Sequence, residues 1–138
     1  MVYSPPEGLS ANAIFKRAMA AFNQADFFEA HELFEDLWRV APEAERLFLQ
    51  GLVQIAVAFH HESLGNRTGA ESVMKRALRN LSGYPDQFAG IRLSALRKSL
   101  QEWTQSFVHG TRTPSLPQLS ASKAVRTCSG KPGNQKSR

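Results

Sequence analysis

The sequence predicts an all-α protein, a single compact bundle of about five helices with a disordered C-terminal tail. Two observations lead to this class. Apolar residues recur three and four positions apart in several successive stretches, which is the spacing of one helix face. No stretch shows the alternation of apolar and polar residues that is typical of a half-buried strand. We therefore expect helices and no sheet.

Length and composition fit one domain. The chain has 138 residues, 42% of them hydrophobic, which is enough to bury a sizeable core. The most apolar run, residues 47–59, is interrupted by Gln50, Gly51 and Gln54 and is shorter than the ~20 residues of a membrane span. We therefore expect no membrane-spanning segment.

The N-terminus and the cysteine content bear on location. The first ten residues, MVYSPPEGLS, lack a charged segment followed by an apolar one, so we expect no secretion signal. The single cysteine, Cys128, can form no disulfide within the chain, which fits a reducing compartment. These features predict a cytoplasmic protein.

The net charge of +5 is concentrated at the C-terminal end. Residues 111–138 hold six Lys or Arg and no acidic residue, whereas residues 1–110 hold eleven basic and twelve acidic residues. The high pI therefore does not indicate a folded part that binds nucleic acid. The tail has no interleaved aromatic residues for base stacking, so we expect it to bind polyanions only nonspecifically.

Residues suited to capping a helix predict where the first two helices begin. Residues 1–9 form an irregular N-terminal arm, and Ser10 is placed to cap a helix over residues 11–23. Asp26 is placed to cap the second helix, with Glu29 three positions later as in a capping box. The second helix carries the stretch FFEAHELFEDLWR.

The third helix, residues 43–64, is predicted to lie at the centre of the bundle. It is apolar nearly all round, as buried helices are. Gly51 lowers helix propensity by ~1 kcal/mol, which indicates that a neighbouring backbone approaches closely there.

The last two helices complete the domain over residues 10–110. Thr68 and Glu71 predict a capping box and a helix that ends near residue 81. Ser94 predicts the cap of a fifth helix, which ends near residue 108. The tail, residues 111–138, is rich in Ser, Pro and basic residues and is predicted to be disordered.

The second helix places an ionisable pair beside a tryptophan. On a helical wheel Glu35 lies about 40° and Trp38 about 20° from His31, with phenylalanines on both sides. We expect this face to be the inner one, with Trp38 packed in the core. A buried polar group without a partner costs ~1–3 kcal/mol, so His31 and Glu35 need partners.

The third helix offers those partners. Around its axis, four polar residues lie within about 40° of one another: Glu43, Gln50, Gln54 and His61. His60 points about 100° away from this line. We therefore expect one shared polar cluster between the second and third helices. It would join His31 and Glu35 to Gln50, Gln54 and His61.

Three motifs together resemble the domain of unknown function 309 family. They are His31-x-x-x-Glu35-x-x-Trp38, RLFLQGLVQIAVAFHH over residues 46–61, and GNRTGA over residues 65–70. The resemblance covers roughly residues 11–107. It implies a compact helical bundle and a functional role for the first motif, with metal binding as a candidate. It brings no established activity, substrate or cofactor.

Three interpretations of His31 and Glu35 stay open. The first is a structural pair that fixes helix packing. The second is a divalent metal site, with His31, Glu35 and His61 as ligands, or His60 as the third. The third is a small-ligand or catalytic pocket.

In the third interpretation Trp38, Gln50 and Gln54 would bind the ligand. No nucleophile stands out, so no catalytic residue and no reaction are assigned. The non-enzymatic alternative is a protein-interaction module in which the His–Glu pair is only structural. The helix-pair pattern and the uneven distribution of charge favour this alternative.

Overall fold

The computed structural model describes residues 10–119 and consists of five helices with one short hairpin. The helices are α1 (Ala11–Asn23), α2 (Phe27–Val40), α3 (Glu43–Ser63), α4 (Arg67–Leu81) and α5 (Leu93–His109). The expected all-α class is confirmed. The arm predicted for residues 1–9 and the part of the tail beyond residue 119 lie outside the described residues.

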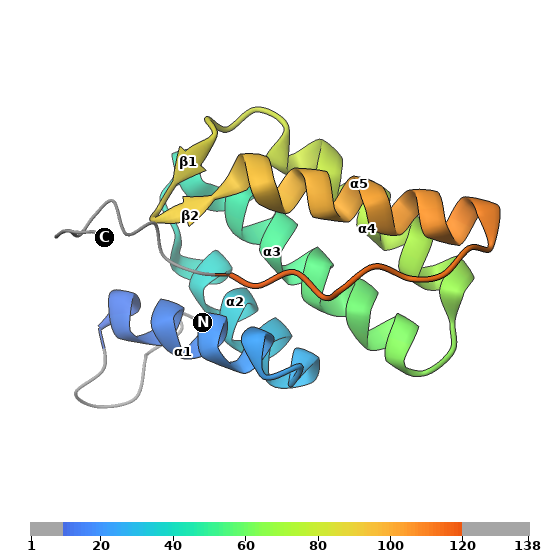
Figure 1. Ribbon diagram of the computed structural model, residues 1–138. Coiled ribbons are helices and arrows are strands. Elements are labelled where there is room, and N and C mark those ends of the chain that lie inside the picture. The colour runs from blue at the N-terminus through green and yellow to red at the C-terminus, as the bar shows by residue number, and fades with distance from the viewer. Residues whose placement is uncertain (1–9, 120–138) are drawn as a thin grey trace, which may run out of the picture.

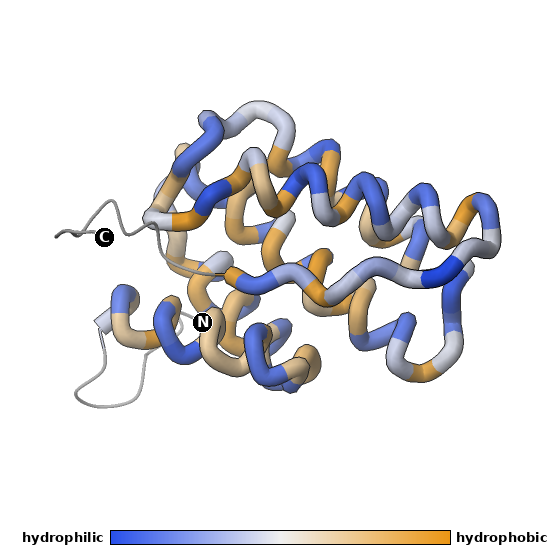
Figure 2. Tube along the Cα trace, in the orientation of Figure 1, coloured by the Kyte–Doolittle hydropathy of each residue, from blue (hydrophilic) through white to orange (hydrophobic). Residues whose placement is uncertain are grey.

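Each helix packs on the next helix in the sequence, and α3 lies between its neighbours (Figure 1). Helix α2 covers one side of α3 and α4 covers another, while α5 packs on α4. Hydrophobic residues on the helices gather toward the interior (Figure 2). The central position of α3 agrees with its nearly uniform apolar sequence.

Gly51 lies at a close contact between α3 and α4. A Cβ atom at this position would lie 2.8 Å from Cγ and Cδ2 of Leu81. Leu81 is itself fully buried. A neighbour therefore approaches Gly51 closely, but it is a side chain of α4 and not the backbone that was expected, so the expectation is corrected in that respect.

Aromatic side chains from different helices meet in the core. Phe59 of α3 contacts the Trp103 ring of α5 edge to face, with the ring centroids 5.0 Å apart. Its ring also stacks on Phe27 and meets the edge of Phe22. These contacts join α1, α2, α3 and α5 in one hydrophobic core.

Two of the expected helix caps form, and two do not. Ser10 accepts a hydrogen bond from the backbone of α1, and Asp26 accepts one from that of α2. Helix α4 is capped by Asn66, whose Oδ1 accepts from Gly69 N–H at 3.0 Å, so the capping box expected at Thr68 is wrong. Helix α5 begins at Leu93 without a side-chain cap, so the cap expected at Ser94 is also wrong.

The connection between α4 and α5 contains a short hairpin that the sequence pattern did not predict. Strands β1 (Gln87–Phe88) and β2 (Ile91–Arg92) pair antiparallel. Ala89 and Gly90 both have positive φ, which is the backbone geometry that a two-residue hairpin turn requires. Strands of two residues are too short to show an alternating pattern.

The start of the C-terminal tail is ordered, which corrects the expectation that disorder begins at residue 111. Residues 111–119 run in extended form back along the bundle (Figure 1). Leu119 is 2% exposed and belongs to the core. Sequence composition missed this segment because its order depends on tertiary contacts, with Trp103 of α5 and with Asn23 of α1, and Asn23 is 96 residues from Leu119 in the chain. No helix within residues 10–119 has the length and hydrophobicity of a membrane span.

Candidate functional site

Helix α2 places its polar motif at the edge of the buried face and not at the centre. The fully buried side chains of α2 lie on another part of its circumference. His31, Glu35 and Trp38 are only half-buried, and Phe28 is 57% exposed. The expected inner face is therefore wrong by roughly 80° of helix rotation. Ala30 is fully buried, although it was not among the core residues expected from the sequence.

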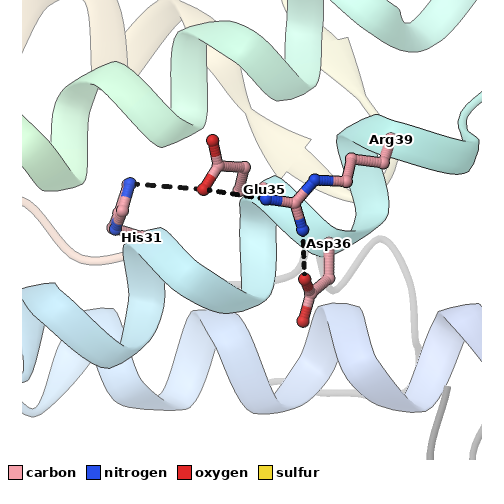
Figure 3. A network of polar contacts seen from close by, with 4 residues as sticks. All are labelled: His31, Glu35, Asp36 and Arg39. Carbon is pink, nitrogen blue, oxygen red and sulfur yellow. Dashed lines mark hydrogen bonds and ion pairs between the residues drawn. The ribbon is translucent and has the colours of Figure 1, made fainter. Parts of the chain in front are cut away.

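His31 and Glu35 belong to a network on one helix (Figure 3). Nε2 of His31 lies 3.6 Å from Oε1 of Glu35, and Nη2 of Arg39 lies 3.6 Å from the same oxygen. Arg39 also donates to Oδ1 of Asp36 at 2.8 Å. The His31 and Glu35 side chains are 25% and 38% exposed. Such solvent-accessible pairs contribute at most ~1 kcal/mol to stability.

Trp38 is paired with an arginine from the next helix. Cζ of Arg46 lies 4.2 Å from the centroid of the Trp38 ring. Nη1 of Arg46 also donates a hydrogen bond to the carbonyl oxygen of Trp38 at 3.2 Å. One guanidinium therefore contacts both the ring and the backbone at the end of α2.

The exposed ring of Phe28 lies between two histidines. Its centroid is 6.0 Å from that of His31 on the same helix and 6.0 Å from that of His60 on α3. The helix-wheel analysis pointed His60 away from the motif, so that expectation is corrected. Arg46, Val53 and His60 are spaced seven residues apart, which puts them on one face of α3. This spacing was the signal in the sequence that His60 lies on the same face as Arg46.

The expected polar cluster between α2 and α3 does not form as one unit. Oε1 of Gln54 accepts a hydrogen bond from Asn80 of α4 at 2.7 Å. Nδ1 of His61 lies 3.3 Å from Nδ2 of Asn66, beyond the end of α3. Gln50 is half-buried on α3. Within residues 10–119, no group of three or more His, Cys, Asp or Glu side chains is arranged to hold a metal ion.

The residues that do come together form what we call the α2–α3 surface. Phe28 pairs with His60 at one end, and Trp38 pairs with Arg46 at the other. These two contacts fix an antiparallel register between the helices. His31 and Glu35 lie between them on α2. The α2–α3 surface consists of Phe28, His31, Glu35, Trp38, Arg46 and His60.

The chemistry available on this surface is recognition by contact. It offers an exposed phenyl ring, two imidazoles that can donate or accept, one carboxylate and one stacked guanidinium. These groups can bind an apolar side chain together with a polar or charged one.

Two comparisons with known proteins bear on the same helices. Residues 15–73 match the model of a family described as Domain of unknown function (DUF309). An uncharacterized protein of Aquifex aeolicus (strain VF5) is 36% identical over 97 residues, which is 69% of this chain and 29% of that protein. The uncharacterized protein YpuF of Bacillus subtilis (strain 168) is 37% identical over 57 residues, 41% of this chain and 33% of that protein.

The chain spans about a third of the length of these curated relatives. The family match begins in α1, includes all of α2 and α3, and ends in α4, so it contains every residue of the α2–α3 surface. The resemblance seen in the sequence is confirmed over this region. Over residues 15–73 the chain is similar to the family described as Domain of unknown function (DUF309).

Proposed function

We propose that this helical domain is a protein-binding module and that the α2–α3 surface contacts an amphipathic helix of a partner protein. The observation that best supports this is the exposure of Phe28, at 57%, between the rings of His31 and His60. Covering an exposed aromatic ring with a partner's apolar side chain is favourable by roughly 25 cal/mol per Å² of apolar area removed from water.

The shape of the surface favours a helical partner. Two antiparallel helices in contact leave a shallow groove between their axes, and a third helix can lie along it. The distance along α2 from Phe28 to Trp38 is ~15 Å, or about three turns. A helix of similar length would present residues at i, i+3, i+4 and i+7 to this groove.

The charge of α2 favours a basic partner. Its sequence contains four acidic residues and one arginine. Arg39 lies close to two of these carboxylates, Glu35 and Asp36. Of the other two, Glu29 pairs with Arg17 of α1 at 3.9 Å, and Glu32 adds an exposed negative charge to the helix. A partner helix with Lys or Arg beside its apolar face would complement this charge and associate faster.

Two synthetic helical peptides test this proposal on the full chain. They share one apolar face and about 14 residues, the length of α2, and differ only in having Lys or Glu on the polar face. Fluorescence anisotropy of the labelled peptides should show binding of the Lys peptide and at least tenfold weaker binding of the Glu peptide. Tenfold corresponds to about 1.4 kcal/mol.

Matched variants locate the binding. Phe28→Ala should weaken binding of the Lys peptide several-fold, because it removes the exposed ring. Val108→Ala is the control, because Val108 is 55% exposed and lies on α5, which contributes no residue to the α2–α3 surface. Equal loss in both variants, or equal affinity for both peptides, would contradict the proposal.

A divalent metal ion is the second candidate ligand. It is supported by the spacing of His31 and Glu35, whose Nε2 and Oε1 atoms face each other across one helical turn. Neutral imidazole and carboxylate are suitable zinc ligands. Calorimetric titration with Zn²⁺ should then give a signal that His31→Ala and Glu35→Gln both abolish. His61→Ala is the control: loss of the signal there would restore the third ligand expected from the sequence.

A further inference from the structure

The segment that follows α5 lies between α5 and α1 (Figure 1). Gly110 has φ of 65° and turns the chain back at the end of the helix. The hydroxyl of Ser106 donates to the carbonyl of Thr111 at 2.9 Å. The indole N–H of Trp103 donates to the carbonyl of Ser115 at 3.1 Å. Helix α5 therefore binds the backbone of the segment at two points.

At the other end, a single side chain of α1 binds both backbone groups of Leu119. The N–H of Leu119 donates to Oδ1 of Asn23 at 2.7 Å, and Nδ2 of Asn23 donates to the carbonyl oxygen of Leu119 at 2.9 Å. A neighbouring β-strand would satisfy an extended residue with the same two bonds. Asn23 thus recognises the backbone of an extended peptide and not a particular side chain.

Apolar anchors accompany these backbone contacts. Pro117 and Leu119 are buried, whereas Leu116 and Gln118 are exposed. Alternate side chains therefore point into the bundle, as in an extended strand. Backbone hydrogen bonds together with pockets for alternate side chains are the way in which protein grooves recognise extended peptides.

The segment lies on the surface between α1 and α5, which we call the groove, and does not fill it. A hollow of about 210 Å³ lies beside Pro117 and Gln118, and it is lined on the side of the bundle by Ile91, Ala95 and Leu96 together with Arg92 and Ser99. A bulkier apolar anchor than proline would find room there. The groove is therefore not shaped uniquely for the residues that it holds.

We propose that the groove between α1 and α5 is a binding site for an extended, proline-containing peptide of a partner protein, and that residues 111–119 are its intramolecular occupant. A partner peptide with two apolar anchors spaced like Pro117 and Leu119 displaces this segment. Prolines in the peptide restrict its conformations before binding and so lower the entropy cost of binding. The site is separate from the α2–α3 surface, and this inference does not depend on the function proposed for that surface.

The experiment uses the full chain with ¹⁵N-labelled tryptophan. The chain has two tryptophans. The Trp103 indole N–H, which donates to Ser115, reports whether the groove is occupied, and that of Trp38 serves as an internal reference. Leu119→Asp should shift the Trp103 signal, because a carboxylate cannot stay in the core. It should leave the Trp38 signal in place, which shows that the bundle is folded.

The synthetic peptide TRTPSLPQL, the sequence of residues 111–119, is then added to Leu119→Asp at ~1 mM, which matches the effective concentration of a short tether. We expect the Trp103 signal to return at least half of the way to its wild-type position. A scrambled peptide should not move it. In the double variant Asn23→Ala, Leu119→Asp, the same peptide should move the Trp103 signal at least fivefold less. The leucine of the peptide then has no Asn23 side chain to bind its backbone.

An unmoved Trp103 signal with a native Trp38 signal would overturn the proposal, because the groove would then accept only its attached segment. If Leu119→Asp does not fold, Leu119→Ala takes its place, because it weakens the same contact without burying a charge. The Trp103 and Trp38 indole signals are then read in the same way. An equal response to the scrambled peptide would also overturn the proposal.

Discussion

Arg46 binds Trp38 in two ways, with its guanidinium 4.2 Å from the ring centroid and a hydrogen bond from Nη1 to the carbonyl oxygen. The pair closes the short turn between α2 and α3. It also fixes the position of the α2–α3 surface at the end opposite Phe28 and His60. The motif tryptophan is therefore held by a cation–π contact at the edge of the core.

Substitution of this arginine by lysine should destabilise the protein. Arg46→Lys keeps the positive charge but loses the planar group over Trp38 and the geometry of the hydrogen bond. We expect a loss of ~0.5–2 kcal/mol in the free energy of unfolding. Urea unfolding measures it, and a variant as stable as wild type would show that charge alone holds the turn.

The two tryptophans should differ in their contribution to stability. Trp103 is 3% exposed and contacts Phe59 edge to face, whereas Trp38 is half-buried. Trp103→Ala should cost ~3–5 kcal/mol, and Trp38→Ala should cost clearly less. Denaturant unfolding of both variants decides this. A larger loss for Trp38 would restore it to the core position that the sequence analysis gave it.

The close contact at Gly51 should not accept a methyl group. Helix propensity favours Gly51→Ala by ~1 kcal/mol, but a Cβ atom 2.8 Å from buried Leu81 overpacks the core at a cost of ~1–3 kcal/mol. We expect net destabilisation on thermal unfolding. Gly83→Ala is the matched control, because a Cβ atom there meets nothing within 4 Å. If Gly51→Ala melted at a higher temperature than wild type, α3 and α4 would be able to move apart at little cost.

Residues 111–119 should contribute to stability. Two truncated chains, one ending at Leu119 and one at Gly110, differ only in this segment. The shorter chain loses the burial of Leu119 and its bonds to Asn23, so it should be less stable by about 2 kcal/mol. Equal melting temperatures would show that the segment rests on the bundle without stabilising it.

Helix boundaries were predictable because their signals are local. Ser10 and Asp26 precede an apolar periodicity, and the helices that follow them start at the next residue. The hairpin and the segment up to Leu119 were not predictable in this way. The strands of the hairpin have two residues each and are too short to show a pattern. The segment up to Leu119 is held by tertiary contacts with Trp103 and with Asn23, which is distant in the sequence.

Three α2 members of the candidate site were named from the sequence, whereas Phe28 of α2 and Arg46 of α3 were not. The wheel put His31, Glu35 and Trp38 on one side of α2, but that side lies at the edge of the core and not at its centre, where it was expected. It could not show how far each helix rotates about its own axis when it packs. That rotation turned His60 toward Phe28 and left Gln54 to pair with α4.

The most direct test of the proposed function is an NMR titration of the ¹⁵N-labelled full chain with the Lys-faced helical peptide. Backbone amide signals locate the contact without prior assumption. The account predicts that the largest shifts fall on Phe28, His31 and His60, and that Phe28→Ala removes them. Shifts concentrated on α4 and α5, or unchanged in Phe28→Ala, would contradict it.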